Sequence, residues 1–360
     1  MLHKELDALK LARVERQVGG CVFEGSERDC VRANLHLRTA IRVLRRLARF
    51  EALDEKALYE VAREVEWETL IAPDARIVID AQSRDSNLNH TRYVEQLVKD
   101  AIVDRFREQT GERPSVDKDD FDLRVHVHIA RNRATLSVDT SGHSLHRRGW
   151  RLHQGRAPLS ETSAAGIVLH SGWDRRAPLL DPFCGTATIL IEAALIASNT
   201  APGIFRKQFG FERWLTNNPV IIEHEREKAR KAVKIPRKLS ILGWDSDETR
   251  IDEARENIES AGMQDLIRVE RAQVRDFAPR AGWNAMIVTN PPYGERIGDV
   301  RKLVPLYREF GKTLREHCSG SCLVLLSGND ELAAELGFSS AYSLGLKNGS
   351  IDCELIKVEV

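Results

Sequence analysis

One stretch near the middle of the chain constrains the fold more than any other. The apolar residues 177–180 lead into residues 181–188 (DPFCGTAT), and residues 189–197 are almost entirely apolar. This order predicts a short buried strand, a turn of small and hydroxyl residues, and a buried helix. Such a turn lets a ligand approach the backbone, and the helix start offers unpaired N–H groups. Because an acid, Asp181, stands where a phosphate would lie, the turn favours a cationic or hydroxyl-rich ligand.

The remainder of the second half alternates between apolar strands and helices. Strands are predicted over residues 177–181, 239–244, 266–270, 284–289 and 321–326, and helices over 164–171, 188–198, 248–261, 300–318 and 330–336. Strands interleaved with helices indicate an α/β fold with a doubly wound, mainly parallel sheet. An Asn348-Gly349 turn between residues 341–347 and 351–360 predicts a C-terminal antiparallel hairpin.

The first half has an α+β pattern without this alternation. Helices are predicted over residues 2–18, 26–47, 58–67 and 94–110, and strands over 21–25, 75–81, 121–130 and 134–139. The polar, weakly periodic residues 141–158 mark a linker, so the first part is expected to end near residue 150. Residues 199–238 form a basic insertion within the second part, and its pattern indicates no function.

Length and composition narrow the class of protein. A chain of 360 residues fits two domains better than one. It has no run of eighteen apolar residues, and its charged start is unlike a signal peptide. Its six cysteines have no zinc-site spacing, so we expect reduced thiols, no bound metal, no membrane span and a cytoplasmic location.

The charge is balanced overall and uneven locally. The formal net charge is zero, with 54 basic and 54 acidic residues, which argues against a strongly basic nucleic-acid binder. Two stretches nevertheless contain arginines and no acid, namely residues 30–50 (Arg32, Arg38, Arg42, Arg45, Arg46, Arg49) and residues 140–160 (Arg147, Arg148, Arg151, Arg156). They indicate either a surface that tracks phosphates or solvated helix and linker faces, and charge alone leaves both open.

Three predicted strand ends carry polar groups. Ligands of doubly wound sheets bind outside the carboxyl ends of the strands. Asp181 ends one strand, and Asp245 ends another, where an acid can hold both hydroxyls of a ribose. The chain lacks the glycine-rich turn that a dinucleotide pyrophosphate requires, which disfavours NAD.

The third strand end reads Asn290-Pro291-Pro292-Tyr293. Two prolines remove two backbone donors and stiffen the turn, and their carbonyls remain as acceptors. With the amide of Asn290 and the ring of Tyr293, they can clamp an exocyclic amino group and stack on its base. The alternative, an ordinary Pro-Pro turn, is less consistent with the acidic turn upstream.

These motifs resemble those of the amino-methylating class I methyltransferases that use S-adenosylmethionine and have a Rossmann-like fold. More closely, the chain resembles the bacterial 23S rRNA guanine-N2 methyltransferases of the RlmL type, which carry an N-terminal THUMP domain. The resemblance includes residues 98–104, 113–117, 139–142 and 145–149 of the first half, and 157–162, 181–185 and 290–296 of the second. It implies a partial ferredoxin-like subdomain over 1–64, a THUMP RNA-binding domain over 65–155 and a methyltransferase domain over 156–360.

The resemblance also implies a reaction and its participants. The cofactor is S-adenosyl-L-methionine, the partner is structured RNA (23S rRNA first), and the reaction is methylation of the N2 amine of a guanine. Asn290, Pro291, Pro292 and Tyr293 are expected to hold the amine. The cofactor is expected against Thr162, Asp181, Phe183, Cys184, Gly185, Thr186, Thr188, Asp245, Gln273 and Asn290.

The chain departs from the family at two positions of this site. Ala187 replaces a glycine, so it must either avoid a positive φ or be strained by it. Gln273 replaces the acid for the adenine amine, and its amide oxygen can accept the same bond. Three alternatives remain open: a tRNA guanine-N2 methylase, a DNA adenine-N6 methylase, and a non-catalytic RNA-binding or assembly protein whose cofactor site has decayed.

Overall fold

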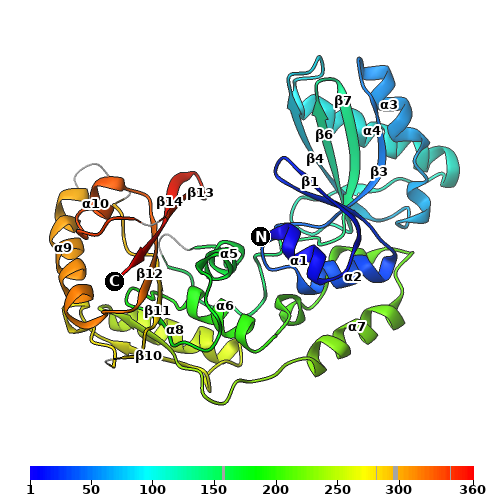
Figure 1. Ribbon diagram of the computed structural model, residues 1–360. Coiled ribbons are helices and arrows are strands. Elements are labelled where there is room, and N and C mark those ends of the chain that lie inside the picture. Colours follow the sequence, from blue (N-terminus) through cyan, green and yellow to red (C-terminus); the bar gives the residue numbers. More distant parts are fainter. Residues whose placement is uncertain (156–158, 281, 295–298, 341) are drawn as a thin grey trace.

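The chain folds into two halves, each with its own hydrophobic core (Figure 1). The computed structural model describes residues 1–360 except 156–158, 281, 295–298 and 341. None of the helices it describes is long and apolar enough to cross a membrane.

The first half is an α+β unit, as expected. Its elements are α1 (Leu2–Ala8), β1 (Ala12–Gln17), β2 (Gly20–Glu24), α2 (Glu27–His36), β3 (Leu44–Glu51), α3 (Glu55–Glu64), β4 (Arg76–Arg84), α4 (Thr91–Thr110), β5 (Ser115–Val116), β6 (Leu123–Ala130) and β7 (Arg133–Asp139). Strands β1 and β2 form a separate hairpin, and the other five form a sheet in the order β3-β7-β6-β4-β5. Helix α4 packs on β4, and α3 packs on α4.

Two predicted helices of this half are wrong. The helix predicted over residues 2–18 ends at Ala8, and residues 12–17 instead pair with residues 20–24 across Gly19, which has a φ of +78°. The helix predicted over 26–47 ends at His36, and β3 pairs with β7 from Leu44↔Asp139 onward. That ladder joins segments about ninety residues apart, so its hydrogen bonds outweigh a local helical spacing of leucines.

The second half confirms the doubly wound, mainly parallel sheet with a terminal hairpin. Its elements are α5 (Glu161–Ser171), β8 (Leu179–Asp181), α6 (Thr188–Ala197), α7 (Pro219–Lys231), β9 (Ile241–Asp245), α8 (Glu248–Ser260), β10 (Ile267–Arg271), β11 (Met286–Thr289), α9 (Asp299–His317), β12 (Cys322–Ser327), α10 (Asp330–Ala334), β13 (Tyr342–Asn348) and β14 (Ile351–Glu359). The strand order is β10-β9-β8-β11-β12-β14-β13. β14 runs antiparallel to both of its neighbours, β12 and β13, and the other described strand pairs of this sheet are parallel. Figure 1 shows α9 and α10 on one side of this sheet and α5 and α6 on the other.

The insertion over residues 199–238 returns to the first half. Phe209, Phe211, Trp214 and Ile222 belong to the hydrophobic core of that half, and α7 packs against α2 (Figure 1). A Cβ on Gly210 would lie 2.7 Å from the backbone nitrogen of Gly142, which is why this contact tolerates no side chain. The insertion therefore ties the two halves together.

Half of the ten arginines in the two acid-free stretches are structural. Arg148 is 1% exposed and donates to Glu192, while Arg38 donates to the carbonyls of Leu195 and Thr200. Other ion pairs join Arg32 to Asp29, Arg42 to Asp139 and Arg151 to Glu161. The stretches are thus not one continuous phosphate-tracking surface, because acids pair with four of their arginines, and two of these acids, Asp139 and Glu192, are buried and distant in sequence.

Candidate active site

A cavity of about 770 Å³ opens at the carboxyl ends of β8, β9 and β11. It lies where β8 and β11 are neighbours, which is the point at which the strand order reverses. Its lining brings together Asp181, Phe183, Cys184, Gly185, Thr186, Thr188, Asp245, Gln273, Asn290, Pro291, Pro292 and Tyr293. Among the predicted site residues, Thr162 is not part of the described lining, and its hydroxyl lies 3.1 Å from that of Ser160.

The turn after β8 is held against the end of β9. The N–H of Cys184 donates to the carbonyl of Trp244 at 2.9 Å, and that of Gly185 donates to Asp245 Oδ2 at 3.1 Å. Ala187 has a φ of +66° and a ψ of +24°, the left-handed conformation, and is fully buried. This conformation costs a residue with a Cβ about 1–2 kcal/mol. The turn therefore keeps the backbone shape that a glycine would adopt, and Ala187 is strained by it.

The carboxyl of Asp181 is buried and accepts two hydrogen bonds, from Thr289 Oγ1 at 2.6 Å and from the N–H of Phe183 at 3.1 Å. Burial raises the pKa of Asp181 to about 7, and the nearby Asp245 adds to the rise, whereas the two hydrogen bonds oppose it. Within the described residues, no ion pair neutralises this carboxyl. A cationic group in the cavity would favour its charged form.

Cys184 is unsuited to nucleophilic chemistry. Burial raises the pKa of its thiol well above the usual value, and the neighbouring Asp181 and Asp245 raise it further. The thiol therefore stays protonated at neutral pH, when a nucleophilic cysteine would need to be a thiolate.

The turn after β11 presents an unpaired acceptor. Asn290 Oδ1 is buried and has no hydrogen-bond partner among the described residues. The phenol of Tyr307 donates to the carbonyl of Pro292 at 3.2 Å, which fixes the turn from α9. A buried acceptor without a donor costs roughly 1–3 kcal/mol, so a ligand donor at this point would remove a penalty that the free protein bears.

Tyr293 lines the cavity and is anchored in the terminal hairpin. It is 6% exposed, and its hydroxyl accepts a hydrogen bond from Asn348 Nδ2 at 2.9 Å. A Cβ on Gly328 would lie 2.8 Å from the ring, so this glycine gives the ring its place. The ring that the sequence predicted to stack on a base is therefore positioned by residues of β13 and the loop after β12.

Some lining residues were not predicted. Leu159 and Ser246 stand near predicted site residues in the sequence. Arg250 lies on α8, and Lys302, Leu303 and Leu306 lie on α9. The lining residues on α8 and α9 could have been expected only from the general rule that the helices of such a sheet begin beside the carboxyl ends of its strands.

Comparison with family models assigns both halves. A model described as an RMKL-like methyltransferase domain matches residues 148–357, which is more than half of the chain. The chain belongs to the RMKL-like methyltransferase-domain family. Models of the THUMP domain and of the RlmL ferredoxin-like domain match residues 52–139 and 1–44.

The curated relatives are longer than this chain. The ribosomal RNA large subunit methyltransferase K/L of Methylococcus capsulatus is 40% identical over 368 residues, which cover 100% of this chain and 50% of the relative. That of Syntrophotalea carbinolica is 40% identical over 369 residues, covering 100% and 52%. The chain thus spans about half the length of these relatives.

Solved structures match over nearly the whole chain. A possible methylase from Clostridium difficile 630 superposes with a TM-score of 0.91 at 33% identity, covering 100% of this chain and 94% of that one. A protein assigned as a methyltransferase and solved in complex with SAH has a TM-score of 0.88 at 28% identity, covering 99% and 93%. The arrangement of both halves is therefore shared with experimental structures.

Proposed function

We propose that the chain is an S-adenosylmethionine-dependent RNA methyltransferase that methylates the exocyclic N2 amine of a guanine, with large-subunit rRNA as its substrate in the cytoplasm. The observation that carries the proposal is the unpaired Asn290 acceptor, which lies in one cavity with the buried carboxyl of Asp181. The names of the curated relatives support rRNA as the substrate.

The residues of the cavity fit the cofactor. S-adenosylmethionine carries an ammonium, a sulfonium, a ribose diol and an adenine, and when bound it supplies an electrophilic methyl group. Asp181 offers a counter-charge without an ion-pair partner among the described residues, Asp245 can accept from the ribose, and Gln273 can accept from the adenine amine. The volume of about 770 Å³ lies within the range of small-molecule sites, roughly 300–1,000 Å³.

The chain's own residues act on the amine by orienting it. The lone pair of a guanine amine is delocalised into its ring, which makes it a weak nucleophile. Asn290 Oδ1 and the carbonyl of Pro291 would accept the two amine hydrogens and turn the lone pair toward the methyl group. Neither acceptor is a base, so the surplus proton leaves to water, and positioning supplies the rate enhancement.

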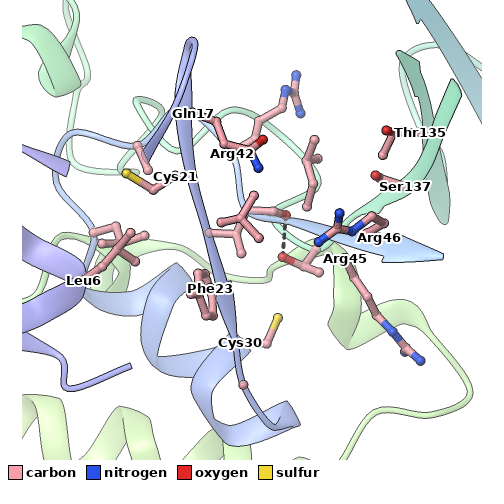
Figure 2. A pocket seen from close by; sticks show the side chains of 18 of the residues that line it. Leu6, Gln17, Cys21, Phe23, Cys30, Arg42, Arg45, Arg46, Thr135 and Ser137 are labelled. Carbon is pink, nitrogen blue, oxygen red and sulfur yellow. Dashed lines mark hydrogen bonds between the residues drawn. The ribbon is translucent and has the colours of Figure 1, made fainter. Parts of the chain in front are cut away.

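A groove in the first half suits the RNA backbone (Figure 2). It measures about 1430 Å³, and Arg45, Arg46 and Arg49 from β3 line it together with Thr135 and Ser137 from β7. These arginines form no ion pair within the part of the chain that the structure describes. Unpaired guanidinium groups beside hydroxyls match phosphates and 2′-hydroxyls.

One observation favours a second function. A structural relative from Listeria monocytogenes, with a TM-score of 0.89 at 32% identity, is described as a predicted N6-adenine-specific DNA methylase. Adenine N6 is also an exocyclic amine, so the same acceptors would serve it. The match of residues 52–139 to a THUMP domain favours RNA.

Nucleoside mass spectrometry tests the proposal. Ribosomal RNA from a strain lacking the gene, incubated with the protein and S-adenosylmethionine, is expected to gain N2-methylguanosine. N2-methylguanosine in tRNA alone, or N6-methyladenine in DNA, would replace the proposed substrate. Asn290→Ala is expected to lower kcat at least about a hundredfold, whereas its cofactor affinity, measured by calorimetry, should change far less. An Asn290→Ala protein of full activity, or a wild-type protein that does not bind the cofactor, would overturn the proposal.

A further inference from the structure

Asn257 joins two segments that are distant in sequence. It lies on α8, is fully buried, and uses both polar atoms of its amide. Its Oδ1 accepts from the N–H groups of Leu152 and His153 at 2.8 and 3.0 Å. Its Nδ2 donates to the carbonyls of His153 and Thr186, each at 3.1 Å. Two donors on one side and two acceptors on the other determine the orientation of the amide, so no other side chain of the same length can supply the same four bonds.

These four bonds connect the linker to the cofactor turn. Leu152 and His153 belong to the segment that leads from the first half into the second. Thr186 lies in the turn after β8 and lines the cavity. Asn257 itself is not part of the described lining, so it acts on the cavity through these neighbours.

Arg151 makes a second connection between the same two segments. Its Nη2 donates to Thr188 Oγ1 and to the carbonyl of Leu159, both at 3.0 Å, and its Nε donates to Glu161 Oε1 at 2.9 Å. Thr188 is the first residue of α6 and also lines the cavity. The linker thus holds the residue before Ala187 through Asn257 and the residue after it through Arg151.

Ala187 explains why the turn needs this support. Its left-handed conformation is unfavourable for alanine, so an unsupported turn would relax toward a negative φ. Relaxation would move Gly185, Thr186 and Thr188, which line the cavity. The bond from the N–H of Gly185 to Asp245 restrains one side of the turn, and the bonds from Asn257 and Arg151 restrain the other.

We infer that Asn257 is a positioning residue that holds the cofactor turn in its binding shape by fastening it to the linker between the two halves. Cofactor affinity then depends on the position of the linker. The same linker is joined to the first half, which is proposed to bind RNA. The inference rests on the proposed function for the identity of the ligand, whereas the support of the turn is a property of the free protein.

The test uses the full chain and two substitutions that divide the role of Asn257. Asn257→Asp keeps acceptors for the N–H groups of Leu152 and His153 and loses the donor to the carbonyls of His153 and Thr186, whereas Asn257→Ala loses all four bonds. In the ligand-free protein, hydrogen–deuterium exchange of a peptide spanning residues 183–191 is expected to accelerate about tenfold or more in both variants, because each loses the bond from Asn257 to the carbonyl of Thr186. Calorimetry is expected to show an SAH Kd raised about tenfold or more.

Asn34→Ala is the matched control. Asn34 is equally buried in the first half, where its amide bonds the carbonyl of Cys30, Thr140 Oγ1 and Ser141 Oγ at 3.0, 2.9 and 2.7 Å. Its loss is expected to lower the melting temperature as much as Asn257→Ala does, with exchange over 183–191 and SAH affinity unchanged. Equal effects of Asn34→Ala and Asn257→Ala on that peptide would reduce the role of Asn257 to general stability.

A milder variant is included in case Asn257→Asp and Asn257→Ala do not fold. Arg151→Lys keeps a positive charge near Glu161 but cannot reach Glu161 and Thr188 at once, so a smaller acceleration is expected in the same peptide. Unchanged exchange over 183–191 in every folded variant would overturn the inference. If the wild-type protein does not bind SAH, the proposed function fails, and the exchange measurement still decides the support of the turn.

Discussion

The hydroxyl of Thr289 donates a 2.6 Å hydrogen bond to the buried carboxyl of Asp181. Thr289 ends β11 and Asp181 ends β8, so this bond joins the two adjacent strand ends at the cavity. The residue after Thr289 is Asn290, which presents the unpaired acceptor. The bond therefore relates the placement of the acceptor to the turn that is proposed to hold the cofactor.

Thr289→Val should separate these strand ends. It removes the donor without changing the shape of the side chain, and Asp181 then keeps one of its two bonds. We expect a loss of about 1–3 kcal/mol in the free energy of unfolding, measured by urea denaturation, and a fall in kcat larger than the rise in KM for the cofactor. Thr289→Ser, which keeps the hydroxyl, should retain both; an equal defect in the two variants would contradict the role of the bond.

Asp181 predicts a pH dependence of stability in the free protein. Its pKa is about 7 when folded, against 3.8 for an aspartate side chain fully exposed to water, so between these values the folded state holds a proton that the unfolded state has lost. Stability from this group is therefore greatest below pH 4, falls as the pH rises to about 7, and is level above. The full effect is at most roughly 4 kcal/mol.

Asp181→Asn isolates this contribution, because asparagine does not titrate. Denaturation at pH 5 and at pH 8 should show the wild-type protein losing stability relative to the variant as the pH rises. A constant difference between the two proteins at both pH values would mean that the carboxyl is not protonated near neutrality.

Asn348→Ala should affect Tyr293 without affecting the cofactor. The variant loses the 2.9 Å bond to the phenol, and the ring, which lines the cavity, gains freedom. We expect kcat to fall about tenfold, with cofactor affinity by calorimetry unchanged. Lys347→Ala is the neighbouring control, because its exposed ion pair with Asp352 should contribute little. An unchanged kcat in Asn348→Ala would mean that the hairpin does not position Tyr293 for the reaction.

Ala187 should tolerate a smaller residue and not a branched one. Ala187→Gly relieves the left-handed strain of about 1–2 kcal/mol and loses a buried methyl of about the same value, so stability should change by less than about 1 kcal/mol. Ala187→Val adds volume and β-branching at a fully buried, positive-φ position and should cost more than about 2 kcal/mol. Thermal melting with and without the cofactor measures both; a well-folded Ala187→Val protein would contradict the left-handed turn.

The groove of the first half should bind RNA through charge. Arg45→Ala and Arg46→Ala are each expected to weaken binding of structured RNA. Each should also reduce the magnitude of the slope of log affinity against log salt concentration by about 1, the value for one lost phosphate contact. Cofactor affinity should not change, because the groove and the cavity share no lining residue. Arg237→Ala, an exposed arginine outside the groove, is the control. An unchanged salt slope in both groove variants would place the RNA elsewhere.

Much of the candidate site could be predicted because its residues stand at strand ends. Asp181, Asp245 and Asn290 each follow an apolar run, and the carboxyl ends of neighbouring parallel strands meet at one edge of a sheet. Local order along the chain was therefore enough to bring these residues together. The C-terminal hairpin was predictable for a similar reason, because an Asn-Gly pair is itself a turn signal.

The sequence-based predictions failed where contacts between segments distant in sequence determine the local structure. Residues 44–51 have leucines at helical spacing and form a strand, because their partner β7 lies about ninety residues later. Arg148 looks like surface charge and is buried, because Glu192 neutralises it across the boundary between the halves. Asn257 is an ordinary helix residue by pattern, and its importance lies in bonds to residues 71 and 105 positions away.

The sequence by itself determined the class of the second half and the chemistry at its strand ends, since hydrophobic period and turn residues are local properties. The tertiary structure alone decided which arginines remain for a ligand, how Tyr293 is anchored, and what supports the turn at Ala187. Each of those depends on buried polar groups finding partners, and a buried donor or acceptor takes its partner from whichever segment the fold brings within about 3 Å.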